Sequence, residues 1–261
     1  MDLGLQGRIA VVTGASKGIG LAITQALVAE GVHVVAGSRR SSPELDELVA
    51  RGRVQAVAVD LAEVTGPADL IAVALAHGRI DILVNNVGAA ATRLTGFLDI
   101  TEDEWLASLN LNLMAAIRTV RAALPSMLAA GRGNIVTTSS VNARLPDPAV
   151  LDYSVAKSGL ASFSKGLSKE VGPRGIRVNT VSPGPVATAL WLGDSGVAAT
   201  VAKASGADAS EVAAQAASNS VTNRFTQPSE VADLVVLLAS DRAGNVTGSD
   251  FVIDGGLLTT L

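Results

Sequence analysis

The sequence contains no cysteine among its 261 residues. This absence excludes disulfide bonds, thiolate nucleophiles and thiolate-bound metals together. Histidine is also scarce, because only His33 and His77 occur. His33 starts a predicted strand and His77 ends a predicted helix, so we interpret both as structural residues. We therefore predict that the chain has no metal site.

Long charged blocks and long apolar runs are absent as well. The formal net charge is -4 at pH 7, and this mildly acidic balance argues against a nucleic-acid partner. We see no apolar run near the roughly 20 residues that span a bilayer, and no signal peptide at residues 1–4. Hydrophobic residues make up 48% of the chain, enough for a sizeable core. We expect a soluble cytoplasmic enzyme or small-molecule binder without a membrane partner.

Short apolar runs alternate with segments of helical periodicity along the chain. The runs typical of strands cover residues 8–13, 32–37, 54–59, 80–84, 134–138, 176–181 and 251–253. Helical spacing covers residues 19–28, 70–76, 105–130, 153–171 and 231–239. Strands this short and apolar, separated by helices, are typical of a parallel sheet covered on both faces. The pattern predicts an α/β fold, with residues 1–261 forming a single doubly wound Rossmann-type domain around a parallel sheet of about seven strands.

Residues 187–223 differ from the rest of the chain in composition and in hydrophobic periodicity. This stretch is rich in alanine, serine and glycine, and its periodicity is weak. It is either a loosely packed helical insertion or a substrate-binding lid. Its position after the sixth predicted strand favours the lid.

A glycine-rich turn, from Thr13 to Gly20, follows the first predicted strand and precedes the first helix. Glycines there permit a tight turn and a close approach of the backbone to a pyrophosphate. The start of the helix offers free N–H groups and a partial positive charge. Placed within a strand–helix–strand unit, the turn indicates a dinucleotide site.

The end of the second strand distinguishes the two nicotinamide dinucleotides. An NAD enzyme needs a carboxylate near this point to accept hydrogen bonds from the ribose 2′-OH, and residues 36–40 contain none. Arg39 could instead bind a 2′-phosphate, Ser38 could donate a hydrogen bond to it, and Lys17 could reach it. The alternative is that Lys17, Arg39 and Arg40 are ordinary surface cations. Their convergence on one point favours NADP(H).

Tyr153 and Lys157 lie four residues apart, which is one helical turn, and so share a helix face. A phenol has a pKa of about 10, and a nearby ammonium lowers that pKa by favouring the phenolate. A tyrosine tuned in this way can protonate a forming alkoxide or deprotonate an alcohol near neutral pH. Tyr153 is the only tyrosine in the chain. It follows the hydroxyl-rich strand end Thr137 to Ser140, at the sheet edge where such folds bind ligands.

These motifs, in this order, resemble the short-chain dehydrogenase/reductase family over essentially the whole chain. The family's T-G-x-x-x-G-x-G motif matches Thr13 to Gly20, and its N-N-A-G motif matches Asn85 to Gly88. Val87 replaces the alanine of that motif, and we expect it to crowd the contact between strand and cofactor slightly. The family's serine matches Ser140 rather than Ser139, and its helix asparagine matches Asn112 rather than Asn110.

The resemblance implies the catalytic residues Asn112, Ser140, Tyr153 and Lys157. With the cations above, the implied cofactor site comprises Gly14, Ser16, Lys17, Gly18, Ile19, Gly20, Ser38, Arg39, Arg40, Asp60, Leu61, Asn86, Val87, Gly88, Tyr153, Lys157, Pro183, Gly184, Val186 and Thr188. By resemblance, Ser140 and Tyr153 hold the substrate oxygen and Tyr153 exchanges the proton. Lys157 tunes Tyr153 and holds the nicotinamide ribose, while Asn112 holds a water that resupplies the proton.

The implied activity is hydride transfer between NADP(H) and a carbonyl or secondary alcohol carbon, and we favour reduction of a ketone or β-keto compound. Two alternatives stay open: an alcohol dehydrogenase working in the oxidative direction, and a non-catalytic dinucleotide-binding sensor. The family's substrate pocket matches Asn142, Leu151 and Trp191. Arg93, Arg144 and Arg224 either bind an acidic substrate or are solvated or at subunit contacts. The helices at 105–130 and 152–171 resemble subunit-pairing helices, so a homotetramer, or failing that a homodimer, is expected.

Overall fold

A parallel sheet of seven strands forms the centre of the protein, whose computed structural model describes residues 2–260. The strands are β1 (Ile9–Thr13), β2 (His33–Ser38), β3 (Val54–Ala58), β4 (Ile82–Asn85), β5 (Gly133–Thr138), β6 (Ile176–Pro183) and β7 (Asp250–Ile253). Their spatial order is β3-β2-β1-β4-β5-β6-β7. The predicted doubly wound, Rossmann-type sheet is therefore confirmed.

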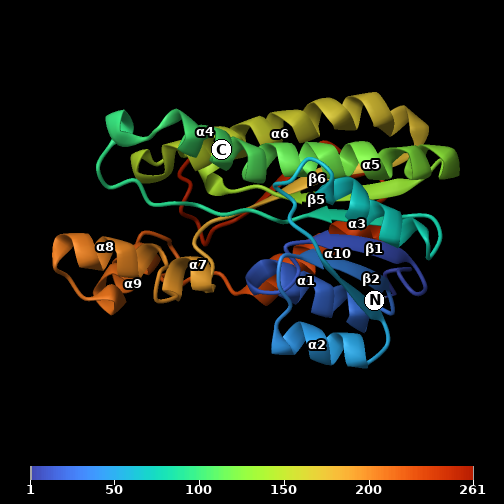
Figure 1. The fold of residues 1–261 in the computed structure, drawn as a ribbon, viewed down its shortest axis with the longest axis horizontal. Helices are drawn as coiled ribbons and strands as arrows, with labels where there is room; N and C mark the ends of the chain where they lie inside the picture. Colours follow the sequence, from blue (N-terminus) through green and yellow to red (C-terminus); the bar gives the residue numbers. More distant parts are fainter. Residues whose placement is uncertain (1, 261) are drawn as a thin grey trace.

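Helices cover both faces of this sheet (Figure 1). The α-helices are α1 (Gly18–Ala29), α2 (Pro43–Ala50), α3 (Gly66–Leu75), α4 (Glu102–Leu109), α5 (Ala115–Ala130), α6 (Leu151–Val171), α7 (Ala189–Leu192), α8 (Val197–Ser205), α9 (Ala209–Ser218) and α10 (Pro228–Ala239). Adjacent residues of β1 point to opposite faces: Val12 packs in one apolar cluster with Ile23 of α1, whereas Val11 packs in a second cluster with Val120 of α5. Because both faces are covered at the centre of the sheet, the central strands β1 and β4 are almost entirely apolar.

One helix, α2, has no counterpart in the sequence prediction, and others begin at different residues. The Ser42 hydroxyl caps α2 by accepting a hydrogen bond from the Leu45 N–H at 3.2 Å, and Pro43 occupies the first turn. Both are ordinary helix-start signals. Helix α3 begins at Gly66 rather than at residue 70. β4 is shifted towards the carboxyl end, because it begins at Ile82 and ends at Asn85.

The predicted single helix over residues 105–130 is instead interrupted. A capping box between Thr101 and Glu104 starts α4, and a π-helix, Asn110–Met114, separates α4 from α5. Within residues 2–260, the run Glu102–Ala130 is the one helical stretch long and apolar enough, by length and composition, to cross a membrane. This finding differs from the sequence prediction, which expected no such run. In the fold one side of α5 packs against the sheet, and about 33% of the most apolar window is buried.

The sheet order places a topological switch between β1 and β4. The chain progresses from β1 towards one edge and from β4 towards the other, which leaves a crevice at the carboxyl ends of these two strands. The predicted segment 187–223 contains α7, α8 and α9. These three helices extend to one side, away from the sheet (left in Figure 1).

Candidate active site

The glycine turn is joined to the end of β4 through the Thr13 side chain. The Thr13 hydroxyl accepts hydrogen bonds from the backbone N–H groups of Asn86, at 2.8 Å, and Val87, at 3.1 Å. The Asn86 amide donates back to the Thr13 carbonyl at 3.0 Å. These contacts hold the N-N-V-G stretch directly against the turn, as the two motifs require if they share a ligand.

Two glycines of the turn have no room for a side chain. A Cβ at Gly20 would lie 2.1 Å from the Gly14 carbonyl oxygen. Gly14 itself has a φ of +68°, and a Cβ there would lie 3.0 Å from the Val87 Cα. The backbone is therefore packed on itself at this point, which fits a cradle for phosphate groups.

Gly20→Ala should prevent the turn from closing. The added methyl would meet backbone atoms of Gly14 and not a flexible side chain, so the turn must shift. We expect loss of dinucleotide binding together with a lower melting temperature. Gly166→Ala is a suitable comparison for glycine loss in itself, because Gly166 does not have a positive φ and nothing lies within 4 Å of its Cβ position. Calorimetry with NADPH and thermal unfolding measure both effects, and normal NADPH affinity in Gly20→Ala would contradict the cradle.

The first turn of α1 lacks a capping side chain. Lys17 is its N-cap residue, makes no side-chain cap hydrogen bond, and no acidic residue follows in the first turn. The predicted cofactor residues Ser16, Lys17, Gly18 and Ile19 occupy this turn and the start of α1. The free N–H groups and partial positive charge at such a terminus suit an anion.

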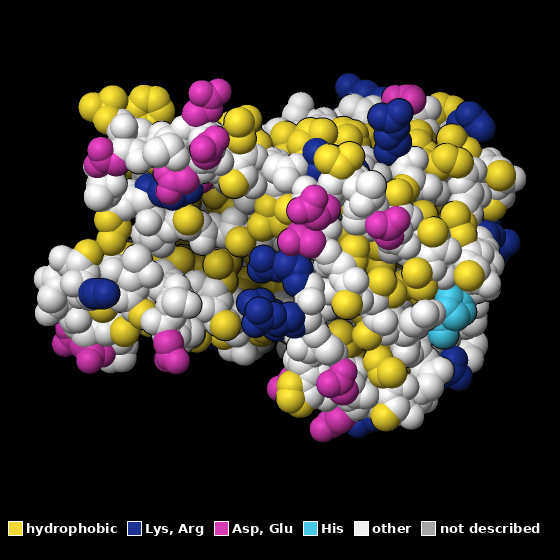
Figure 2. All heavy atoms as spheres, viewed as in Figure 1, with side chains coloured by type: hydrophobic (Ala, Val, Ile, Leu, Met, Phe, Trp, Pro, Cys, Tyr) yellow, Lys and Arg dark blue, Asp and Glu magenta, His cyan; other side chains and the backbone are white. Residues whose placement is uncertain are grey.

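The predicted phosphate-reading cations lie exposed near the same point. Lys17, Arg39 and Arg40 are all exposed, and none forms an ion pair with another residue in the 2–260 range. Figure 2 shows lysine and arginine side chains gathered where the α7–α9 segment meets the α1 side of the molecule. Ser38 differs from expectation, because its hydroxyl donates to the Arg40 carbonyl at 2.9 Å and so shapes the turn that presents the arginines.

The stretch after β6 reaches the glycine turn. Together with Pro183, the last residue of β6, it supplies four predicted cofactor residues, the others being Gly184, Val186 and Thr188. A Cβ at Gly18 would lie 3.2 Å from Thr188 Cγ2, so this stretch closes over the turn. On the other side, Asp60 and Leu61 follow β3. The Asp60 carboxylate accepts the Ala62 N–H at 2.9 Å, and Leu61 is buried.

Ser140, Tyr153 and Lys157 are brought together by β5 and α6. Ser140 follows the end of β5, and Tyr153 and Lys157 lie on the first turns of α6. The Lys157 Nζ lies 5.5 Å from the centre of the Tyr153 ring and donates to the Thr138 carbonyl at 2.8 Å. Lys157 is 2% exposed. The last residue of β5, Thr138, thus holds the Lys157 ammonium next to the phenol ring, and Ser140 follows the same strand.

The pKa of Tyr153 differs from the sequence expectation. Burial raises the pKa of Tyr153 to about 12, while its hydrogen bond with Ser140 acts in the opposite direction. Burial also lowers the pKa of Lys157 to about 8. The four-residue spacing indicates only that an ammonium lies near the phenol, whereas desolvation depends on the packed structure and disfavours both charged forms.

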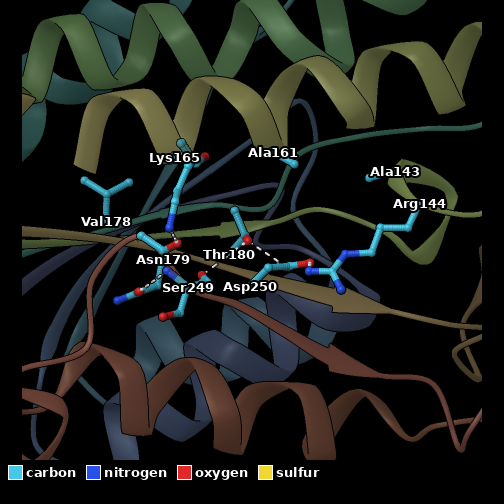
Figure 3. A pocket seen from close by; sticks show the side chains of 11 residues that line it. Ala143, Arg144, Ala161, Lys165, Val178, Asn179, Thr180, Ser249 and Asp250 are labelled. Carbon is cyan, nitrogen blue, oxygen red and sulfur yellow. Dashed lines mark hydrogen bonds and ion pairs between the residues drawn. The ribbon is translucent and has the colours of Figure 1, made fainter. Parts of the chain in front are cut away.

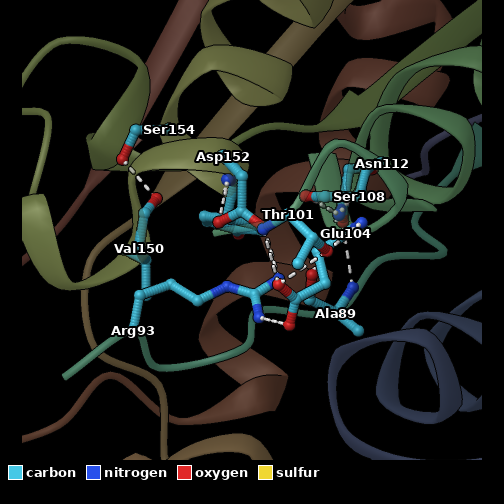
Figure 4. Close-up of polar contacts among 10 residues, drawn as sticks. Ala89, Arg93, Thr101, Glu104, Ser108, Asn112, Val150, Asp152 and Ser154 are labelled. Atoms are coloured by element: carbon cyan, nitrogen blue, oxygen red, sulfur yellow. Dashed lines mark hydrogen bonds and ion pairs between the residues drawn. The ribbon is translucent and has the colours of Figure 1, made fainter. Parts of the chain in front are cut away.

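Asn112, and not Asn110, faces the candidate site. The Asn112 amide exchanges two hydrogen bonds of 2.9 Å with the backbone of Ala89, directly after the N-N-V-G stretch (Figure 4). A Cβ at Gly88 would lie 2.8 Å from Asn112 Oδ1 and 3.5 Å from Lys157 Nζ. Asn110 instead donates to the Ala62 carbonyl at 2.7 Å. The π-helix explains the choice, because it changes which side chains point inward, and such bulges are frequent at functional sites.

The predicted substrate residues differ in how directly they contact the candidate catalytic residues. Asn142 contacts Ser140 directly, because its Oδ1 accepts from the Ser140 hydroxyl at 3.1 Å. Leu151 begins α6, two residues before Tyr153. Trp191 stacks edge-on against Phe225, with ring centres 5.5 Å apart. This contact joins α7 to the chain that follows α9.

The three arginines considered for acidic substrates are each engaged by carboxylates. Arg93 pairs with Asp152 and Glu104, and Arg224 pairs with Glu230. Arg144 pairs with Asp250.

Arg144 lines a cavity between α6 and the edge strand β7 (Figure 3). The cavity has a volume of about 270 Å³. Arg144 lies 2.9 Å from the Asp250 carboxylate there, and the Lys165 Nζ donates to the Gly248 carbonyl at 2.7 Å. None of the residues lining this cavity is a candidate catalytic residue. The structure therefore places the Arg144 side chain in an ion pair at the sheet edge.

Sequence reasoning missed two polar residues of the site. Thr13 was considered only as part of a motif, although its hydroxyl joins β1 to the end of β4. Asn85 is 3% exposed, and its amide has no hydrogen-bond partner within residues 2–260. A buried amide without a partner is unusual and suits a site that a polar ligand completes. The double asparagine at the end of an apolar strand is the signal that could have found it.

Comparison with known proteins supports the family suggested by these motifs. Residues 14–258 match the family described as enoyl-(acyl carrier protein) reductase. D-threitol dehydrogenase of Mycolicibacterium smegmatis is 38% identical, with 98% of this chain and 94% of that protein covered. The 3-oxoacyl-[acyl-carrier-protein] reductase of Vibrio harveyi is 34% identical, with 98% and 99% covered.

Solved structures agree with this relationship. L-sorbose reductase from Gluconobacter frateurii, complexed with NADPH and L-sorbose, superposes with a TM-score of 0.91 at 35% identity and covers 100% of both chains. A putative NAD(P)-dependent gluconate 5-dehydrogenase from Beutenbergia cavernae, with bound NADP, gives a TM-score of 0.88 at 33% identity and also covers 100% of both. The chain is an oxidoreductase of the short-chain dehydrogenase/reductase family.

Proposed function

We propose that this protein is an NADPH-dependent reductase that converts a ketone or β-keto compound to a secondary alcohol. The observation that carries the proposal is the grouping of Ser140, Tyr153 and Lys157 at the carboxyl edge of the sheet, beside the glycine turn. A non-catalytic sensor would have no need for a tyrosine supported by a buried lysine. The presence of all three side chains in contact therefore favours an enzyme.

The cofactor site fits NADP(H) on several independent features. The crowded glycine turn and the uncapped start of α1 suit the pyrophosphate, and the unpartnered Asn85 amide lies at the end of β4. Lys17 and Arg39 are free to bind a 2′-phosphate, and residues 36–40 contain no carboxylate that would repel it. L-sorbose reductase, which is similar over the whole chain, was crystallised with NADPH. When bound, NADPH supplies the hydride.

The chain's own residues orient the substrate and move the proton. Ser140 and Tyr153 donate hydrogen bonds to the carbonyl oxygen, which polarises it and places it for reaction. Tyr153 gives its proton to that oxygen as negative charge develops. The Lys157 ammonium stabilises the resulting phenolate, and Asn112 holds the backbone after Gly88 beside it. The segment 187–223 closes over the substrate as a lid, with the Trp191–Phe225 stack as its anchor.

The pH dependence of reduction should follow Lys157. Its pKa of about 8 means that it is charged below this pH and neutral above it, whereas Tyr153, with a pKa of about 12, keeps its proton. We expect kcat/KM for reduction to be flat at neutral pH and to fall as the pH rises through about 8. In Lys157→Met, kcat/KM should be lower than in the wild type and should no longer fall near pH 8. A wild-type profile that stays flat to pH values near the pKa of Tyr153 would contradict the role of Lys157.

The direct test is the loss of NADPH absorbance, and separately of NADH absorbance, with a panel of substrates. Simple ketones, diketones, quinones, β-keto esters and thioesters, and ketoses such as L-sorbose cover the compounds named for similar proteins. Consumption of NADPH with one class would support the proposal and begin to identify the substrate. Bound NADPH without consumption by any member would favour the sensor. Faster turnover of secondary alcohols with NADP⁺ would favour the oxidative direction.

A further inference from the structure

Arg93 joins the starts of two helices that lead to candidate catalytic residues (Figure 4). Its Nη2 donates to Asp152 Oδ2 at 2.9 Å, and its Nη1 donates to Glu104 Oε1 at 2.6 Å. Asp152 directly precedes Tyr153 in the first turn of α6. Glu104 lies in the first turn of α4, which runs into the π-helix that carries Asn112. One guanidinium therefore bridges the two helices.

The link to Tyr153 is short and buried. Asp152 uses its second oxygen, Oδ1, to accept the backbone N–H of Tyr153 at 3.0 Å. The side chain of Asp152 is 1% exposed and that of Arg93 is 16% exposed. The backbone N–H of Arg93 also donates to the Ala149 carbonyl at 2.6 Å, just before α6 begins. A buried carboxylate needs its cation, so this pair holds the start of α6 firmly.

Among the described residues, 2–260, no side chain caps the start of α6. Its N-cap residue, Val150, has no side-chain hydrogen bond. The first turn of α6 must nevertheless be placed accurately, because it carries the phenol. The Arg93–Asp152 and Arg93–Glu104 pairs link that turn to α4, in addition to the direct packing of α6 on α4.

We propose that Arg93 is a positioning residue that holds Tyr153 in place for proton transfer by bracing α6 against α4. The proposal rests on the proposed function in one respect, the assignment of the proton-transfer step to Tyr153. The same contacts argue against an acidic substrate at Arg93, because two carboxylates already pair with its guanidinium.

The chain offers a comparison variant at a second buried carboxylate, in the pair formed by Arg79 and Asp81. The Asp81 side chain is 8% exposed, accepts the Ile9 N–H at 3.0 Å through one oxygen, and accepts the Arg79 Nε at 2.8 Å through the other. This pair lies before β4, at the amino edge of the sheet and so opposite the candidate site. Arg79→Met thus removes an arginine from a buried carboxylate without touching the start of α6, although Asp81 keeps a second arginine, Arg132, at 3.8 Å.

Steady-state kinetics separate positioning from general destabilisation. We expect Arg93→Met to lower kcat by about 10²-fold, which is the effect of a small misplacement at a reacting centre. The KM for the substrate and the KM for NADPH should change little. Arg93→Lys should recover only part of the loss, since an ammonium cannot engage both carboxylates as a planar fork does. Arg79→Met should keep its kcat. Equal losses in Arg93→Met and Arg79→Met would overturn the proposal. A raised substrate KM at unchanged kcat would overturn it in favour of substrate binding.

A second measurement does not depend on turnover. Tyr153 is the only tyrosine, so protein labelled with ¹³Cζ-tyrosine gives a single resonance from this residue. We expect that resonance to shift or broaden in Arg93→Met and to stay unchanged in Arg79→Met. An unchanged resonance in Arg93→Met would overturn the positioning role. If the resonance shifts in Arg93→Met but the wild-type protein reduces no substrate, the result would support the brace and reject the proposed function.

Discussion

Tyr153→Phe should lower kcat by more than the roughly 10²–10⁴-fold that an ordinary general acid contributes. The substitution removes one hydroxyl, which is both the proton donor and one of two groups that orient the substrate oxygen. Ser140 and Lys157 remain, but neither can replace the proton at the same atom. The phenylalanine ring keeps the packing of the tyrosine ring above Lys157. NADPH affinity should therefore stay close to that of the wild type.

Stopped-flow oxidation of NADPH under single-turnover conditions measures this loss on the chemical step. NADPH fluorescence titration and thermal unfolding serve as controls for cofactor binding and folding. Turnover within tenfold of the wild type would show that another group supplies the proton. Because Tyr153 is the only tyrosine, no other phenol in the chain could take over the role.

Arg39→Asp should reverse the preference between NADPH and NADH. A hydrogen bond to a charged group contributes about 1.5–3 kcal/mol, so its loss alone should weaken NADPH binding roughly 10- to 150-fold. The new carboxylate would also repel the 2′-phosphate. The same carboxylate could accept hydrogen bonds from the free ribose 2′-OH, which should strengthen NADH binding.

Arg40→Asp is the matched control for this change. Arg40 is an exposed neighbour whose carbonyl accepts the Ser38 hydroxyl, so its backbone position is fixed by the same turn. Dissociation constants for both cofactors with both variants decide which side chain binds the phosphate. An unchanged preference in Arg39→Asp, with a switch in Arg40→Asp or Lys17→Asp, would assign the phosphate to that other cation.

Local features of the sequence predicted much of the fold. The short apolar runs predicted the seven strands, because the strands of a parallel sheet covered on both faces are typically short and apolar. The glycine turn was predictable because its glycines are close together in the chain. In the structure, a side chain at Gly14 or Gly20 would collide with the backbone. By contrast, α2 was missed although Ser42 and Pro43 signal its start. The π-helix at Asn110–Met114 has no comparable local signal.

The sequence by itself determined the order of the strands along the chain, the glycine turn, and the Tyr153–Lys157 spacing, because each depends on residues close together in the chain. Only the tertiary structure decided the raised pKa of Tyr153 and the partners of Arg93. Desolvation depends on everything that surrounds a group, and the Arg93–Asp152 pair joins residues 59 positions apart. Such contacts arise only once β4, α4 and α6 have packed together, so no local pattern in the sequence encodes them.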